Sequence, residues 1–132
     1  MTPLFMLDTD TVSCALRGEG RVAERLLEHR PSDLCVSAIT LAELHYGAEA
    51  KRSRKLRRLI DTFTETVSTL PFDAHAAVRF GTVAAALARS GTPIGGFDTL
   101  IAAHALAHGL SLVTNNTQHF RYVRGLKVES WA

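Results

Sequence analysis

Three acidic residues lie next to apolar segments or at the start of predicted helices, where an ionised carboxylate is unusual unless it has a specific structural or chemical role. Asp8 directly follows an apolar run, and Glu43 lies among the apolar residues of a predicted helix. Asp98 stands at the predicted start of another helix. A carboxylate among apolar neighbours is costly unless it is paired or bound to a metal ion. Three hard oxygen donors favour Mg2+ or Mn2+, which also bind phosphate oxygens and lower the pKa of an attacking water. The set therefore predicts metal-dependent phosphoester chemistry.

Each of these acids also has a simpler explanation when it is taken alone. Asp8 or Asp10 would serve as the cap of the helix that follows, and Asp98 is a candidate cap of its own helix. Glu43 would be satisfied by a salt bridge or by reaching solvent. Capping requires one acid, whereas the first segment has two. The metal hypothesis therefore rests on the combination of acids and not on any one of them.

The elements that would position these acids alternate between strands and helices. Segment 4–11, an apolar run that ends in two carboxylates and two hydroxyls, predicts the central strand, buried on both faces. Ligands of open α/β sheets bind at the carboxyl ends of the strands, where this segment places its acids. Further strands are predicted over residues 33–37, 67–72, 110–114 and 126–129. Helices are predicted over residues 11–17, 21–30, 74–90 and 99–108, from a cap at Ser37 or Thr40 to just before Gly47, and around residues 56–63.

This alternation predicts an α/β fold with right-handed crossovers, in which helices flank both faces of a central parallel sheet of four or five strands. Pro71 near the end of the third strand favours an edge position for that strand. Asp73 is a cap candidate for the helix that follows, and Gly91 is typical of a helix C-terminus. Helix 99–108 is apolar nearly all round, which predicts that it is buried and holds Asp98 firmly against the sheet.

Composition limits the class of protein. The 132 residues suit one domain, 1–132, and a net charge of +2 permits a polyanionic partner without requiring one. Cys14 and Cys35 lack the spacing of a zinc or redox motif, so buried free thiols in a reducing cytoplasm are expected. No apolar stretch reaches the roughly 18 residues of a membrane span, and no secretory signal pattern is present at the N-terminus.

Several common catalytic sites are not indicated. His104 and His108 lie one helical turn apart but lack the glutamate and third ligand of a zinc protease, so packing or surface roles are expected for them. The same holds for the remaining histidines, including His119. No serine or cysteine lies in a nucleophile elbow, and no glycine loop has the spacing of a phosphate-binding loop.

The stretch 51–58 concentrates six of the fifteen basic residues in eight positions. Two interpretations remain open. The stretch is either a solvated helix face or a surface that contacts phosphates. Its distance from the acids decides between them.

Four ordered segments resemble the motifs of PIN-domain ribonucleases, and most closely those of the VapC toxin group. These segments are FMLDTD at 5–10, SAITLAELHYG at 37–47, IGGFDTLIAA at 94–103, and LVTNNTQHF at 112–120 with GLKVESW at 125–131 behind it. The resemblance spans the whole chain. It implies a PIN-like nuclease domain that acts as a magnesium-dependent (or manganese-dependent) endoribonuclease. It also implies the toxin role of a type II toxin-antitoxin pair, a cognate antitoxin and a homodimer.

The resemblance also implies roles for individual residues. Asp8, Glu43 and Asp98 would be the metal ligands and, with Asn116, the catalytic residues; Thr9, Thr114 and Asn115 would line the site. Two positions depart from the family pattern. Many relatives carry aspartate at the position of Asn116, which would weaken a second metal, and asparagine is commoner than Asp10, whose role stays open.

Two rival functions remain. The segment DTDTV at 8–12 also resembles the first motif of haloacid-dehalogenase-like phosphatases, but no convincing lysine motif follows, and a helix is predicted where that family has a flap. The second rival is a non-catalytic, partner-binding PIN module. Crowded like charges cost stability unless a cation is present, which disfavours a purely structural role for the acids.

Overall fold

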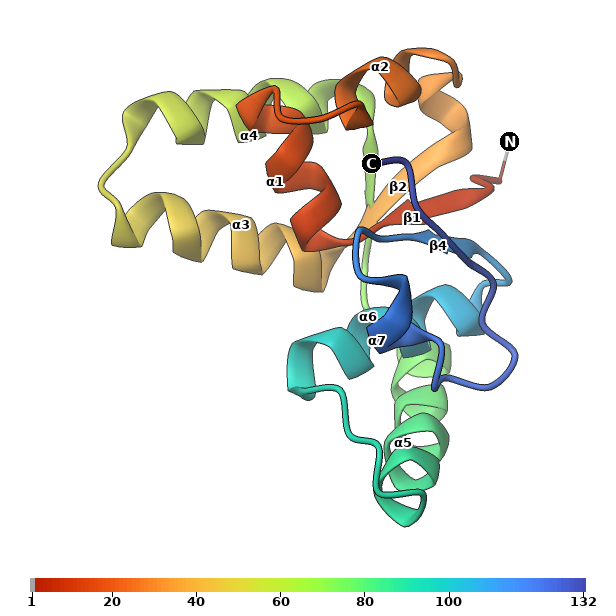
Figure 1. Cartoon of the computed structure of the whole chain (residues 1–132). Coiled ribbons are helices and arrows are strands. Elements are labelled where there is room, and N and C mark those ends of the chain that lie inside the picture. The colour runs from red at the N-terminus through yellow and green to blue at the C-terminus, as the bar shows by residue number, and fades with distance from the viewer. Residues whose placement is uncertain (1) are drawn as a thin grey trace.

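The computed structural model describes residues 2–132, which form an α/β fold around a five-stranded, all-parallel sheet (Figure 1). The strand order is β3-β2-β1-β4-β5, so the first strand lies at the centre, as predicted. The third strand lies at the edge, which confirms the interpretation of Pro71. The strands are β1 Phe5–Leu7, β2 Leu34–Ser37, β3 Ser68–Leu70, β4 Ser111–Val113 and β5 Val128–Glu129.

Helices cover both faces of the sheet because successive strand residues point to opposite sides. Met6 packs with α5, α6 and α7 in one apolar core, whereas Leu7 packs with α1, α3 and α4 in the other. The predicted burial of the central strand on both faces is therefore confirmed. The helices are α1 Thr9–Arg17, α2 Val22–Leu27, α3 Ala38–Ala50, α4 Arg54–Thr66, α5 Ala74–Arg89, α6 Gly96–Ala107 and α7 Thr117–Phe120, with a 3-10 turn at Pro31–Asp33.

Some predicted boundaries are wrong, and each error has a local cause. The first strand ends at Leu7 instead of residue 11, because Asp8 caps α1 and the following residues are helical. Helix α3 continues through Gly47 to Ala50, since packing against α4 outweighs the low helix propensity of one glycine. Helix α2 ends at Leu27, three residues before the predicted end.

The start of α6 also differs from the prediction. The helix begins at Gly96 after an N-cap at Gly95, whose φ of 95° is a conformation that glycine adopts without strain. Asp98 is therefore the third residue of the helix and does not cap it. By contrast, the caps predicted at Ser37 and Asp73 are present, with Oγ of Ser37 3.0 Å from the amide of Ile39.

Helices α3 and α4 form a hairpin that projects from the body of the molecule (Figure 1). The base of α3 lies at the end of β2, and residues 51–53 form the turn at the far end. Within residues 2–132, none of the helices is both long and apolar enough to cross a lipid bilayer.

Candidate functional site

The carboxyl ends of the three central strands meet at one edge of the sheet, because all strands run parallel. Asp8 follows β1, α3 leaves the end of β2, and Thr114 follows β4. The amide of Asp8 donates to the carbonyl of Val113 at 3.0 Å, which ties the first of these ends to the third. The sheet thus brings the residues predicted from distant segments to a common edge.

Asp8 combines a structural role with a chemical one. Its Oδ1 accepts the amide of Thr11 at 2.9 Å and so caps α1, while the side chain is 4% exposed. Burial raises the pKa of this carboxyl above its usual value, and the Thr114 hydroxyl opposes the rise. Oγ1 of Thr114 accepts the amide of Asn116 at 3.0 Å, so the Thr114 hydroxyl remains able to donate its hydrogen to the Asp8 carboxylate. The capping explanation is therefore correct, but it leaves a buried carboxylate that capping alone does not require.

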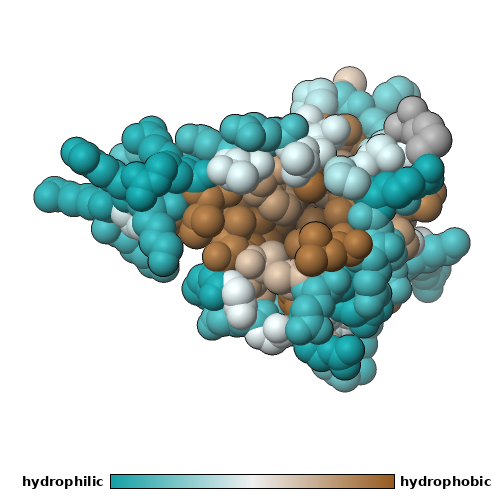
Figure 2. Space-filling model, turned by 90° about the horizontal axis from the view of Figure 1, so that it is seen from above, coloured by the Kyte–Doolittle hydropathy of each residue, from teal (hydrophilic) through white to brown (hydrophobic). Residues whose placement is uncertain are grey.

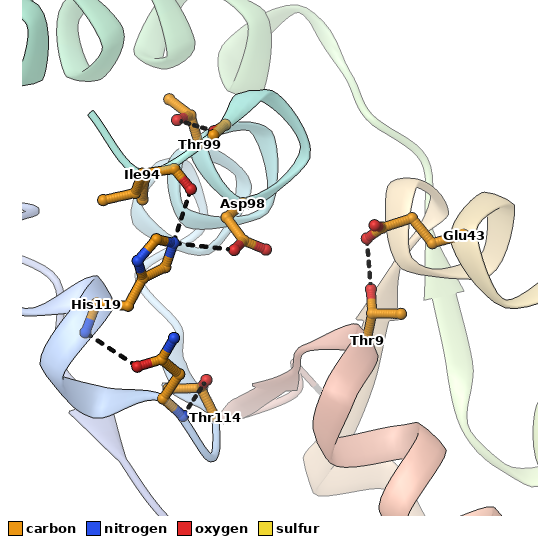
Figure 3. A network of polar contacts seen from close by, with 9 residues as sticks. Thr9, Glu43, Ile94, Asp98, Thr99, Thr114 and His119 are labelled. Carbon is orange, nitrogen blue, oxygen red and sulfur yellow. Dashed lines mark hydrogen bonds and ion pairs between the residues drawn. The ribbon is translucent and has the colours of Figure 1, made fainter.

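Glu43 lies on the second turn of α3, half-buried at the site edge. The hydroxyl of Thr9 donates to Oε1 of Glu43 at 2.6 Å (Figure 3) and lies 3.3 Å from the Thr40 hydroxyl. A hydrogen bond to a carboxylate is short and strong, so it fixes one oxygen and leaves the other for a ligand. Thr9, predicted to line the site, does so by holding Glu43.

Asp98 is held by a histidine that the sequence did not single out. Nε2 of His119 lies 3.1 Å from Oδ2 of Asp98 and 2.7 Å from the carbonyl oxygen of Ile94 (Figure 3). A carbonyl only accepts, so Nε2 carries the proton and donates to both. Burial raises the pKa of the Asp98 carboxyl, His119 opposes the rise, and the charge of Asp10 adds to it.

The two asparagines have different surroundings. Asn116 is exposed and caps α7. Its Oδ1 accepts the amide of His119 at 3.3 Å and so helps to hold the backbone of that residue in place. Asn115 donates through Nδ2 to the sulfur of Cys14 at 3.2 Å, and its buried Oδ1 has no partner within residues 2–132. Both lie in the loop after β4 and make contacts that shape it. The catalytic role of Asn116 and the site-lining role of Asn115 stay predictions.

The acids reach the same edge of the sheet but do not close on one another. In Figure 3, Asp98 and Glu43 face each other from opposite sides, with the segment at Thr114 below them. In the described part of the chain, no three acidic, histidine or cysteine side chains lie close enough to enclose an ion directly. The charge of Asp10 raises the pKa of both Asp8 and Asp98, so negative charge is concentrated here.

This donor set fits Mg2+. All the donors are carboxylate oxygens, and Mg2+ is commonly bound by one or two carboxylates while it keeps several waters. Burial, with a smaller contribution from the charge of Asp10, raises the pKa of the Asp8 and Asp98 carboxyls, and a bound cation would favour their ionised forms. Asp8, Glu43 and Asp98 are therefore suited to hold the ion, partly through water.

The zinc alternative gains no support from the structure. The rings of His104 and His108 lie 5.3 Å apart, but Nδ1 of His104 pairs with the Ser37 hydroxyl at 2.8 Å and Nε2 of His108 pairs with Asp73 at 3.0 Å. These contacts join α3, α5 and α6, so the pair has a packing role, as predicted. The helix that begins directly after β1 also leaves no room there for a phosphatase flap.

The family model that describes the PIN domain matches residues 5–126. The chain belongs to the PIN-domain family. This PIN domain is 38% identical over 129 residues to the "tRNA(fMet)-specific endonuclease VapC" of Shigella flexneri, covering 97% of this chain and 98% of that protein. It is 35% identical to the "Ribonuclease VapC2" of Haemophilus influenzae over 96% of this chain and 97% of that one.

Solved structures agree with this family. The DNA-bound VapBC of Salmonella typhimurium includes a chain that superposes with a TM-score of 0.88 at 37% identity, over 99% of this PIN domain and 100% of that chain. A chain of VapBC2 from Rickettsia felis, bound to a promoter DNA fragment, gives 0.88 at 31% identity, over 98% and 99% of the two chains. The resemblance to PIN-domain ribonucleases of the VapC group and the predicted α/β fold class are confirmed.

Proposed function

We propose that this PIN domain is a magnesium-dependent endoribonuclease and the toxin of a toxin-antitoxin pair. The observation that carries the proposal is that the parallel sheet brings three acids to its carboxyl edge. Asp8 directly follows β1, and Glu43 and Asp98 face each other across that edge in Figure 3. Relatives between 31% and 38% identical are named as VapC ribonucleases, which favours RNA as the substrate.

The three acids would hold Mg2+, or Mn2+ in its place. When bound, the metal lowers the pKa of a water and stabilises the leaving oxygen of a phosphodiester. The chain's own groups keep the ligands in position. Thr9 fixes one oxygen of Glu43, and His119 fixes one oxygen of Asp98. The hydroxyl of Thr114 donates a hydrogen bond to the Asp8 carboxylate. No protein nucleophile is needed.

Initiator tRNA is the substrate that we propose to test first. The relatives from Shigella flexneri and Salmonella typhimurium, 38% and 37% identical over nearly the whole chain, are both named tRNA(fMet)-specific endonucleases. Recognition of folded RNA uses shape and unpaired bases, which sets this substrate class apart from small aryl phosphates.

The antitoxin would be a second protein that covers apolar surface next to the site. Figure 2 shows apolar side chains gathered beside the hairpin. A groove of about 390 Å³ between α1, α3 and α4 is lined by Leu16, Leu56 and Leu59, and also by Thr9 and Glu43. A protein segment in this groove would reach the metal ligands and block substrate. Self-association as a homodimer is a further proposal, checked by sedimentation velocity of the purified chain.

Cleavage of an initiator tRNA transcript tests the function. Purified protein should cut it with Mg2+ or Mn2+ and not in excess chelator. Asp98→Asn should reduce the rate at least about a hundredfold, because it removes a charged ligand at the reacting centre. Asp61→Asn is the matched control, since Asp61 is an exposed acid on α4. Cleavage in chelator, or equal rates for both variants, would exclude the mechanism, and hydrolysis of an aryl phosphate would favour the phosphatase alternative.

A further inference from the structure

The positive charge of the chain is concentrated at one place. We call it the basic tip, defined as the far end of the α3–α4 hairpin with Lys51, Arg52, Arg54, Lys55, Arg57 and Arg58. The chain has fifteen basic and thirteen acidic residues, and six of the basic ones lie in the tip. The rest of the chain therefore carries nine basic against thirteen acidic residues. The net charge of +2 is therefore the sum of a strongly basic tip and a remainder of the chain that is net acidic.

The side chains of the basic tip are available to a ligand. All six are exposed, and one of them, Arg57, forms an ion pair, with Glu49 at 3.1 Å. The other five have no ion-pair partner in the described chain, residues 2–132. Arg52, Arg54 and Arg57 line a depression of about 200 Å³ with the hydroxyl-bearing Ser53. One acid, Glu49, also lines it and is paired with Arg57, so Arg52 and Arg54 are the two guanidinium groups there without an ion-pair partner in residues 2–132. Planar guanidinium groups around a small depression suit the oxygens of a phosphate.

Two features of the basic tip oppose folding. Arg52 has a φ of 50°, the one positive φ of a residue other than glycine within residues 2–132. This left-handed conformation costs roughly 1–2 kcal/mol for such a residue. Arg54 and Lys55 lie in the first turn of α4, where the helix dipole disfavours positive charge, and no acid lies in that turn. Strain kept at a surface points to a binding role for the residues that cause it.

The basic tip is also continuous with the candidate site. The groove that begins at Thr9 and Glu43 ends at Lys51 and Lys55. Along α3, the eight residues from Glu43 to Lys51 span about 12 Å. A strand whose phosphodiester lies at the acids would thus pass the basic tip within a few nucleotides.

We propose that the basic tip binds the phosphate backbone of the RNA substrate beside the cleavage site. This inference rests on the ribonuclease function proposed above. The carboxylates of the candidate site repel RNA phosphates, so the basic tip would supply the electrostatic attraction that holds the RNA. The contacts are to backbone and not to bases, so they increase affinity without selecting sequence.

The test separates RNA binding from cleavage. Asp98→Asn serves as the background so that RNA is not cut, and a fluorescein-labelled initiator tRNA transcript is titrated by anisotropy. The tip variant, Arg52→Gly with Arg54→Gln, removes two charges. The control variant, Arg79→Gln with Arg89→Gln, removes two exposed charges from α5. Labelled poly-L-glutamate is titrated in parallel as an acidic polypeptide, and thermal unfolding of both variants is recorded.

The expected loss follows from counterion release. Each phosphate contact changes the slope of log K against log salt by about 0.7, which is about fivefold in affinity at 0.1 M salt. The tip variant should therefore bind tRNA about 25-fold more weakly, with its slope reduced by about 1.4, while the control stays within about twofold. The tip variant should melt at the same temperature as its Asp98→Asn background or at a higher one. It lacks the strained Arg52 side chain and the Arg54 charge that opposes the α4 dipole.

Some outcomes would overturn the inference. Equal tRNA affinities of the tip and control variants would do so, as would a loss confined to poly-L-glutamate, which would assign the tip to an acidic protein segment. These results are independent of cleavage. A chain that binds tRNA through the tip but never cuts it would contradict the proposed function alone.

Discussion

Replacing Asp8 separates the two roles of this residue, helix cap and buried charge. In the parent, Oδ1 of Asp8 lies 2.9 Å from the amide nitrogen of Thr11. Asparagine retains an Oδ1 that can accept this amide, whereas alanine has none. Asparagine and aspartate are about equally good caps. Asp8→Asn therefore removes the charge and retains the cap, and Asp8→Ala removes both.

The sign of the charge effect follows from burial. The helix dipole favours a negative cap by about 0.3–1 kcal/mol at the surface and by up to about 2 kcal/mol in partly buried sites. The pKa of Asp8 is nevertheless raised, because burial of a residue that is 4% exposed outweighs the hydrogen bonds to its carboxylate. Each unit of that rise corresponds to about 1.4 kcal/mol lost to the ionised form. Metal-free Asp8→Asn should thus unfold at a higher temperature than the parent at neutral pH.

The cap sets the difference between the two variants. Loss of a capping oxygen costs about 1 kcal/mol. For 132 residues this corresponds to about 3.5 °C in the melting temperature, so Asp8→Ala should melt that far below Asp8→Asn. With Mg2+ at ten times its dissociation constant, the parent should gain about 1.4 kcal/mol and neither variant should gain it.

Differential scanning calorimetry in chelator and in Mg2+ measures all three quantities. A metal-free Asp8→Asn that melts at or below the parent would show that burial of the charge is not destabilising. Equal melting of the asparagine and alanine variants would show that the cap contributes nothing. A parent that is indifferent to Mg2+ would contradict metal binding by the carboxylates.

Three further predictions concern neighbouring groups. Burial raises the folded pKa values of Asp8 and Asp98 above their usual value of 3.8, so the free energy of unfolding falls as pH rises from 3.8 through the raised values. In urea titrations at several pH values, the double variant Asp8→Asn with Asp98→Asn should gain stability relative to the parent across that window, and the gain should then level off. Thr9→Val should slow Mg2+-dependent cleavage about tenfold or more, because a hydrogen bond to the Glu43 carboxylate is worth about 1.5–3 kcal/mol, while Thr9→Ser should keep the rate; equal rates would mean that the bond does not position this acid. Ser37→Ala should cost about 2 kcal/mol in urea unfolding, because the cap of α3 and the partner of a buried histidine are lost together, and a cost well under 1 kcal/mol would contradict this.

The sequence was sufficient for features that depend on local pattern. The central strand was predicted because its residues are apolar without alternation, which only burial on both faces explains. The caps at Ser37 and Asp73 were predicted because a short polar side chain before an apolar helix has few other uses. Three acids that follow such elements were enough to indicate a shared site.

Features that depend on distant contacts could not be predicted in this way. The sequence predicts a surface or packing role for His119, but in the fold this residue contacts Asp98, 21 positions away, because α7 lies beside α6. The start of α6 was misplaced because Gly95 has no side chain to signal a cap, and its positive φ emerges only in the fold. The only local signal for His119 is its place three residues after Asn116, whose side chain accepts the His119 amide, and this spacing does not reveal the contact with Asp98.

The chain thus keeps like charges together at two ends of α3, acids near its start and bases at its far end. Within each cluster the like charges repel one another, and the few contacts that the fold supplies to them, such as Thr9 to Glu43 and Glu49 to Arg57, offset this repulsion only in part. A phosphodiester with its metal is the kind of ligand that relieves both, since the cation offsets the acids while the phosphates offset the bases. Neutralising the basic tip should therefore weaken substrate binding more at low salt than at high salt, whereas removing an acid should slow cleavage at any salt. The two clusters act on one ligand only if these two dependences are found to differ.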